Sequence, residues 1–283
     1  MNKAHVSTLS TEDAVRHLRS ESRYRDLVRD TYLDEDVEAA AARFATSGEW
    51  DAEVQLLGER IQGARVVDVG AGIGLASRAF VLGGAKSVWA IEPDPSEEVG
   101  RGALARVCRG LSVDALDCRA EDLRLPDGCA DIVYARQVLH HTRDLNRALR
   151  ECARVLRPGG IFLACREHVV ESEDELRKFR ASHPVHQLTG GENAYRLSEY
   201  RDAIADAGLR MTREFGPFES VINLFPAVQA DSEIPHLVQT RLRQRFGWFG
   251  ARAARIPVIY ALALRRITRP RPGRLHTFLA QRL

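Results

Sequence analysis

The feature that most constrains the fold is the stretch from Val67 to Gly74, which reads Val-Asp-Val-Gly-Ala-Gly-Ile-Gly. Its β-branched first half is typical of a short buried strand, and its second half has glycine at alternate positions. Glycine lets the backbone turn sharply and approach a ligand without a Cβ clash. A helix expected over Leu75–Leu82 would point its free N–H groups at that ligand. A glycine triplet also occurs in purely structural turns, so the surrounding sequence has to decide between the two interpretations.

Strands and helices alternate after this turn, which predicts βαβ units and a mostly parallel sheet. Seven strands are expected, at Arg65–Val69, Ser87–Ile91, Ser112–Asp117, Asp131–Ala135, Ile161–Cys165, Leu209–Phe215 and His276–Ala280. A helix over Leu145–Leu156 ends at a Pro-Gly-Gly stop signal, and Ser198 is expected to cap another helix that ends at Gly208. The predicted fold class is α/β, with a seven-stranded sheet and helices on both of its faces.

Four parts are predicted along the chain. Residues 1–60 are expected to form an N-terminal helical cap with helices over Thr11–Val28 and Glu35–Phe44, because apolar residues recur there at three- and four-residue steps. Residues 61–218 are expected to form the core, 219–272 a helical insertion, and 273–283 the last strand of the core.

The predicted insertion at 219–272 differs in composition from the rest of the chain. It holds nine arginines against three acids, although the net charge of the whole chain is only +2. Aromatic and aliphatic residues are interspersed with these arginines, so we expect a helical lid over the substrate pocket. The second, less favoured interpretation is a basic amphipathic segment that lies on an anionic membrane surface and admits a lipophilic acceptor.

Composition excludes several classes of function. The low net charge argues against electrostatic binding of nucleic acid, and the five cysteines form no CxxC pair, so no zinc site is expected. The odd number of cysteines fits a reducing cytoplasm. Residues 1–30 are charged throughout, which predicts no signal peptide, and the longest apolar run, Ile256–Leu264, is about half of what a membrane span needs. We therefore expect a cytoplasmic protein.

The spacing of the glycines distinguishes between nucleotide ligands. A dinucleotide fingerprint, G-x-G-x-x-G, would need glycine at position 75, where this chain has Leu75. Glu92 lies at the end of the next expected strand, 22 residues after Gly70. A carboxylate at that place can accept hydrogen bonds from both ribose hydroxyls of an adenosine. The pattern therefore indicates an adenosine-containing ligand that is not a nicotinamide dinucleotide.

Several stretches in a fixed order resemble class I S-adenosylmethionine-dependent methyltransferases, over roughly Ala64–His168. They are residues 66–74, Ile91-Glu92-Pro93, Ala120-Glu121-Asp122-Leu123 with Pro126-Asp127-Gly128, Asp131-Ile132-Val133-Tyr134 with Val138-Leu139-His140-His141, and Val155–Gly160. The resemblance implies a Rossmann-like core and S-adenosylmethionine as the cofactor.

The resemblance also implies roles for individual residues. Asp68 and the backbone from Gly70 through Ala71 and Gly72 to Gly74 would hold the amino and carboxylate groups of the methionine part. Glu92, followed by Pro93, would take the ribose, while Ala120 and Glu121 would border the adenine. Many relatives have an aspartate just before that Ala-Glu pair, but this chain has Arg119, which cannot accept a hydrogen bond. Glu121 or a backbone carbonyl is expected to take over that contact.

Methyl transfer from a sulfonium is an in-line displacement, so it demands proximity, alignment and a dry pocket. A base is needed only where the acceptor has a proton to lose. His140 and His141, just past the fourth expected strand, are the candidates for that base. The alternative is that the two histidines pack against the cofactor or cap the following helix. Arg136 is expected to contact the methionine carboxylate or the substrate, with a similar structural alternative.

The acceptor is predicted only by class. The Asn-Pro-Pro-Tyr type of motif, found in methyltransferases that act on the amino groups of nucleobases and glutamine, is replaced here by Tyr134-Ala135-Arg136-Gln137. A small molecule methylated on oxygen or carbon is therefore favoured over DNA, and the pattern most resembles methyltransferases of quinone, sterol and natural-product pathways. Two other functions stay open. One is a protein that binds S-adenosylmethionine without methyl transfer, and the other is a nicotinamide-dependent oxidoreductase, against which Leu75 counts.

Overall fold

The computed structural model of the chain, described here for residues 9–182, 184–189, 193–253 and 274–283, is built around one mixed sheet. The strand order is β3 (Val113–Leu116), β2 (Ser87–Ile91), β1 (Arg65–Val69), β4 (Ala130–Arg136), β5 (Leu156–Val170), β8 (Arg274–Arg282) and β7 (Leu209–Phe215). The first five of these strands run parallel, and β8 runs antiparallel to both of its neighbours. The predicted α/β, Rossmann-like class is confirmed.

The sheet has eight strands, so the predicted number of seven was wrong by one. The eighth is β6 (Tyr195–Arg196), which pairs in parallel with Val169 and Val170 beside the main path of the sheet. Strand β5 continues well beyond the predicted end at Cys165, and this extension gives β6 its partner. The polar residues Arg166 and Glu167 interrupt the apolar run in the sequence, but pairing with β8 keeps the backbone extended there.

Helices cover both faces of the sheet because successive strand residues point to opposite sides. Val66 and Tyr134 pack with helices on one face, while Val67 and Val133 pack with helices on the other. The first face carries α3 (Val37–Ala45), α4 (Gly48–Leu57), α5 (Leu75–Leu82) and α6 (Arg101–Val107). The second carries α7 (Leu145–Val155) and α10 (Leu197–Asp206).

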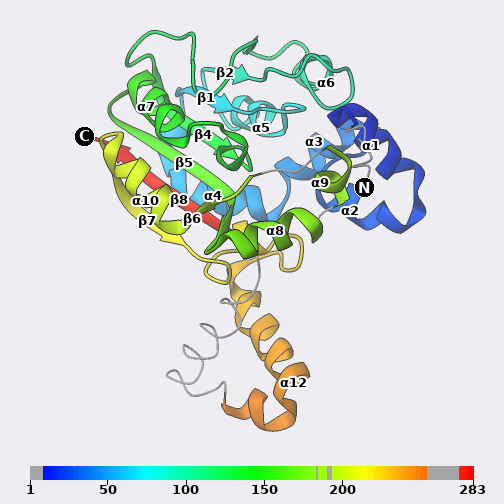
Figure 1. The fold of residues 1–283 in the computed structure, drawn as a ribbon. Coiled ribbons are helices and arrows are strands. Elements are labelled where there is room, and N and C mark those ends of the chain that lie inside the picture. The colour runs from blue at the N-terminus through cyan, green and yellow to red at the C-terminus, as the bar shows by residue number, and fades with distance from the viewer. Residues whose placement is uncertain (1–8, 183, 190–192, 254–273) are drawn as a thin grey trace, which may run out of the picture.

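The N-terminal region is helical but more broken than the sequence predicts. Instead of one helix over Thr11–Val28 it forms α1 (Thr11–Ser20), a 3-10 turn, and α2 (Arg25–Asp30). The Ser20 hydroxyl donates to the His17 carbonyl at the break, in competition with the helix hydrogen bonds. Figure 1 shows these helices at one side of the sheet, with α9 (Pro184–Thr189) next to them.

Two other helix boundaries differ from those predicted from the sequence. Helix α10 starts at Leu197, so Ser198 lies inside it and does not cap it. The Glu199 carboxylate instead accepts from the Arg196 N–H at 2.7 Å. Helix α7 ends at Val155, and Leu156 already belongs to β5. Helix α8 (Glu173–Ser182) then follows β5.

The connection between β7 and β8 holds α11 (Val221–Leu224), a 3-10 turn and α12 (Ile234–Ala253). Ile234, Val238 and Leu242 bury the first turns of α12 against Phe218 and Val228. Figure 1 shows α12 projecting away from the body of the molecule. Residues 254–273 lie outside the described part, so the domain boundaries and the lid or membrane role predicted for 219–272 stay predictions. Within the described ranges, no helix combines the length and apolar character needed to cross a membrane.

Two glutamates join the N-terminal cap to the sheet. Glu49 and Glu53 are four residues apart on α4 and both are fully buried. Glu49 forms an ion pair with Arg136 at the end of β4, with an Nε–Oε1 distance of 2.6 Å, and Tyr134 donates its hydroxyl hydrogen to Glu53 at 2.8 Å. The Arg136 charge lowers the pKa of Glu49 against the effect of burial. Burial and the Glu49 charge together raise the pKa of Glu53 to about 8.

This raised pKa predicts how stability changes with pH. A glutamate with an ordinary pKa of 4.5 when unfolded and about 8 when folded loses a proton on unfolding, so rising pH favours the unfolded chain between those values. Urea unfolding should therefore show the wild type losing stability relative to Glu53→Gln as the pH rises from about 5 to 8. Glu59→Gln, at an exposed position, should follow the wild-type curve. Parallel curves for wild type and Glu53→Gln would contradict the assignment of a neutral Glu53.

Candidate functional site

The glycine loop between β1 and α5 has the backbone that its sequence predicts. Gly70, Gly72 and Gly74 all have positive φ angles, of 66°, 52° and 87°, which other residues rarely adopt. A Cβ on Gly70 would lie 2.2 Å from a methyl carbon of Val138, so glycine is also required there by close packing. The loop is thus held against the segment that follows β4.

Two carboxylates flank this loop. Asp68 is buried and accepts from the Ser77 hydroxyl at 2.6 Å, and burial raises the pKa of Asp68 to about 7. Glu92 follows β2 and accepts from the backbone N–H groups of Gly72 and Asp94, each at 2.8 Å. Burial raises the pKa of Glu92, while these two hydrogen bonds act in the opposite direction. Both acids therefore lie in surroundings that would favour a nearby cation.

A cavity of about 290 Å³ lies over the loop. Its wall combines parts of the N-terminal cap, the glycine loop and the end of β4. The lining residues are Thr11, Thr31, Tyr32, Leu33, Asp68, Gly70, Ala71, Gly72, Ile73, Leu75, Ala76, Val99, Tyr134, Arg136, Gln137 and His141. The cap thus forms one side of the space in front of the loop, which makes it a pocket that suits a small molecule.

Five of the predicted cofactor residues, Gly74, Glu92, Pro93, Ala120 and Glu121, lie outside the lining of this cavity. Glu92 and Pro93 both accept from the Arg101 guanidinium through their backbone carbonyls, at 2.7 and 2.9 Å. Ala120 is buried in the core cluster beneath α7. The Glu121 carboxylate accepts from the Arg143 N–H at 2.7 Å.

The two candidate histidines have different surroundings. His140 is only 1% exposed, and its Nδ1 lies 2.7 Å from the carboxylate of Glu167. His141 is exposed and lines the cavity, with its ring centroid 4.2 Å from that of His140. Of the pair, only His141 is therefore placed to meet a ligand in this cavity.

Glu167 holds the turn that carries both histidines. Its carboxylate accepts from the backbone N–H groups of Val138, Leu139 and His140, each at 3.1 Å. Glu167 is fully buried, and burial raises its pKa while these hydrogen bonds favour the charged form. One side chain on β5 thus fixes the backbone turn of Leu139–His141 that follows β4.

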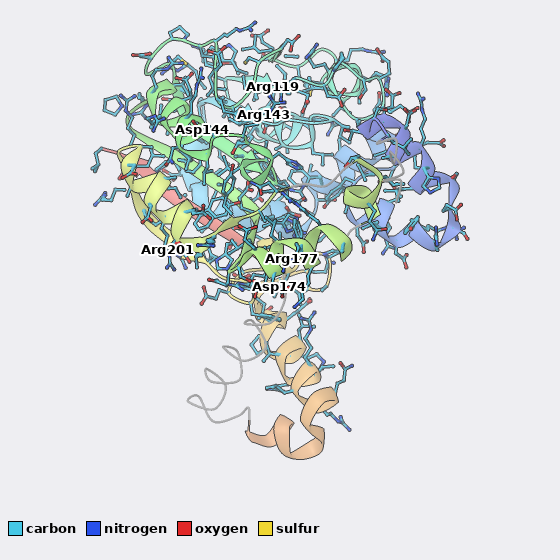
Figure 2. The ribbon with its side chains drawn as sticks, in the orientation of Figure 1. Arg119, Arg143, Asp144, Asp174, Arg177 and Arg201 are labelled. Carbon is cyan, nitrogen blue, oxygen red and sulfur yellow. The ribbon has the colours of Figure 1, made fainter. Side chains whose placement is uncertain are left out.

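Arg136 lines the cavity, but its guanidinium is committed to Glu49 through two hydrogen bonds of 2.6 and 3.1 Å. Arg119, which replaces the expected aspartate, is exposed, as is Arg143, and Figure 2 labels both in its upper part. Neither Glu49 nor Glu167 is among the site residues predicted from the sequence. The sequence does contain a pattern that indicates a buried Glu49. Glu49 and Glu53 occupy the same helix face as the buried Leu57, where apolar residues would be expected.

Comparisons with known proteins agree with this geometry. A model of a methyltransferase domain family matches residues 67–164, from the glycine loop into β5. The ubiquinone biosynthesis O-methyltransferase of Rhizobium etli is 28% identical over 183 residues, which cover 63% of this chain and 73% of that relative. The aligned region covers 64% of the same enzymes from two other rhizobial strains. Residues 67–164 thus match a methyltransferase domain, and these similarities support a class I S-adenosylmethionine-dependent methyltransferase.

Solved structures show that the fold of this methyltransferase is shared. An S-adenosylmethionine-dependent methyltransferase from Mesorhizobium loti has a TM-score of 0.56 at 17% identity, and the match covers 84% of this chain and 100% of that one. A geranyl diphosphate methyltransferase solved with S-adenosylmethionine has a TM-score of 0.55 at 15% identity, with 88% and 92% covered. The predicted cofactor, S-adenosylmethionine, and a small-molecule methyl acceptor are both supported.

The cavity fits this cofactor chemically. The cofactor carries a sulfonium and an ammonium cation, and the cavity offers the buried carboxylate of Asp68, whose raised pKa shows that its charge is poorly balanced in the protein alone. At Gly72, which lines the cavity, an added Cβ would have no protein atom closer than 4.0 Å, so a ligand can approach the backbone there.

The role of Glu167 can be tested without a ligand. Glu167→Gln leaves one carbonyl oxygen for three N–H donors and removes the charge, which should cost about 3 kcal/mol of stability. Amide hydrogen exchange should become faster at Val138, Leu139 and His140, while Glu173→Gln, at an exposed position on α8, leaves it unchanged. Unaltered protection of these amides in Glu167→Gln would show that the turn is held by other contacts.

Proposed function

We propose that this methyltransferase moves the methyl group of S-adenosylmethionine to a hydroxyl oxygen of a small aromatic, quinone-type acceptor. The observation that most strongly supports this proposal is that the glycine loop, Asp68 and His141 all line one cavity. The name of the Rhizobium etli relative, a ubiquinone biosynthesis O-methyltransferase, supports oxygen as the methylated atom.

In this proposal the chain binds the cofactor with the residues that its family motifs indicate. Asp68 holds the ammonium group, and the backbone of Gly70–Gly74 holds the methionine carboxylate, because free N–H groups at the start of α5 favour an anion. The Glu92 carboxylate accepts hydrogen bonds from the Gly72 and Asp94 N–H groups, and its remaining lone pairs accept hydrogen bonds from the ribose hydroxyls. Pro93, Ala120 and Glu121 border the adenosine part at the ends of β2 and β3.

The bound cofactor supplies a methyl group on a positively charged sulfur. The protein has to align the acceptor oxygen behind that methyl group, exclude water and remove the hydroxyl proton. The N-terminal cap excludes water from one side of the cavity. His141 accepts the proton, since imidazole accepts protons near neutral pH and no other histidine lines this cavity within the described residues. Glu167 and His140 fix the turn that presents His141.

A direct test of the function is transfer of a radiolabelled methyl group to a panel of hydroxylated aromatic compounds. Transfer to oxygen on at least one of them supports the proposal. Binding of S-adenosylhomocysteine without turnover on hydroxyl, carbon or amine acceptors would favour the alternative of a cofactor-binding protein. Transfer to carbon or nitrogen alone would overturn the assignment of oxygen.

The proposed role of Asp68 predicts proton release on binding. A carboxyl group with a pKa of about 7 becomes fully ionised once an ammonium group lies beside it. Calorimetry of S-adenosylhomocysteine binding at pH 7, in two buffers of different ionisation enthalpy, should show release of roughly half a proton. Asp68→Asn should abolish that release and weaken binding about tenfold, whereas Asp114→Asn on the exposed face of β3 changes neither. Heats that do not depend on the buffer would contradict this role of Asp68.

The proposed role of His141 predicts a selective loss of turnover. His141→Gln should lower kcat by about a hundredfold, because a positioned base contributes that much, while affinity for S-adenosylhomocysteine stays the same. His236→Gln, at an exposed position outside the cavity lining, is the matched control and should keep full activity. If His141→Gln turns over at the wild-type rate, catalysis relies on proximity alone.

A further inference from the structure

A second cavity lies on the other side of Tyr32. Its volume is about 630 Å³, and it is enclosed by the N-terminal cap and the loop that follows α11. Its lining residues are Arg29, Asp30, Tyr32, Arg43, Thr46, Ser47, Phe225, Pro226, Ala227 and Gln229. Tyr32 lines both this cavity and the one over the glycine loop, so the two cavities meet at this residue.

The backbone of Tyr32 has an unusual conformation for a buried tyrosine. It is 1% exposed and has a φ angle of 59°, a left-handed conformation that costs energy for a residue with a side chain. Its ring packs edge-on against Phe44 and lies parallel to that of Phe225, at centroid distances of 5.6 and 6.5 Å. Such a conformation is kept only where the surroundings enforce it, so the position of the ring is well defined.

The hydroxyl group of Tyr32 is buried and has no hydrogen-bond partner among the residues that the structure describes. The neighbouring Ser47 hydroxyl accepts from the Trp50 N–H at the start of α4. Burial and the Glu49 charge raise the pKa of the Tyr32 phenol, although Ser47 and Arg136 act in the opposite direction. The phenol therefore keeps its proton, and a buried donor without a partner costs stability unless a ligand accepts from it.

The lining of the second cavity indicates the chemistry of that ligand. Phe225 and Pro226 offer flat apolar surface beside Tyr32, while hydroxyl and amide groups come from Thr46 and Gln229. The two arginines of the lining are already paired with acids: Arg29 with Asp30 at 3.0 Å, and Arg43 with Asp34 at 2.5 Å. An uncharged, flat molecule with oxygen substituents suits this lining better than a phosphate or a carboxylate does.

We propose that the second cavity binds the methyl acceptor as an uncharged aromatic ring, with the Tyr32 hydroxyl donating to one of its oxygens at the boundary of the cofactor cavity. This assignment rests on the proposed methyl transfer. Tyr32 is a positioning residue in it, because its hydroxyl orients the acceptor and takes no part in the bond that forms or breaks. The acceptor oxygen held by Tyr32 then lies next to the cavity that contains the glycine loop and His141.

The test uses 2,3-dihydroxynaphthalene, a fluorescent, uncharged aromatic diol, titrated into the full chain saturated with S-adenosylhomocysteine. Tyr32→Phe should weaken binding of this probe about tenfold, the value of one lost hydrogen bond. The same variant should keep its cofactor affinity and should unfold at an equal or higher temperature, because an unpaired buried hydroxyl has been removed. Tyr24→Phe, a tyrosine outside both linings, is the matched control and should bind the probe like the wild type.

A second variant tests the cavity independently of the hydroxyl. Ala227 is exposed and lines only the second cavity, so Ala227→Trp should block the probe and leave S-adenosylhomocysteine binding unchanged. Unchanged probe affinity in Ala227→Trp overturns the cavity assignment, and unchanged affinity in Tyr32→Phe overturns the role of its hydroxyl. Because binding is read without turnover, a failure of methyl transfer itself stays distinguishable from a failure of this inference.

Discussion

The buried ion pair between Arg136 and Glu49 links most features of this molecule. A charge in a protein interior is tolerated only when it is paired and hydrogen-bonded, and here one partner ends a central strand while the other belongs to the N-terminal cap. The pair therefore fixes the cap over the carboxyl end of the sheet. Burial and the charge of Glu49 together raise the pKa of Glu53, so the second carboxyl group favours its neutral form.

The cap that this ion pair holds in place shapes both cavities. The guanidinium of Arg136 lies 5.5 Å from the centre of the Tyr32 ring, with Arg43 at 5.2 Å from the same ring. The ring of Tyr32, a residue that lines both cavities, is thus positioned partly by the cation that also anchors α4. A substitution that disturbed this ion pair would change the shape of both the cofactor cavity and the second cavity, although the two are lined by largely different residues.

A second buried acid organises the other wall of the site. Glu167 on β5 satisfies three consecutive N–H groups that would otherwise be unpaired in the interior, and in doing so fixes the turn that carries His140 and His141. The Glu49 and Glu167 contacts each place an acid from another element against the end of β4 or the turn that follows it. The strand ends of a parallel sheet meet at one edge, so short polar contacts there are enough to assemble a site.

The sequence alone determined the features that depend on local pattern. The β-branched run Val66–Val69 and the glycines of Gly70–Gly74 predicted a buried strand followed by a tight turn, because both depend on neighbouring residues. The alternation of strands and helices predicted the fold class, and the resemblance of several motifs to methyltransferases implied the cofactor. Tertiary structure decided which of His140 and His141 faces a cavity and which acids are buried. Glu49 is 87 residues from Arg136, and Glu167 is 27 from His140. The energy of a buried charge depends on the partner that folding brings to it, and no local pattern records that partner.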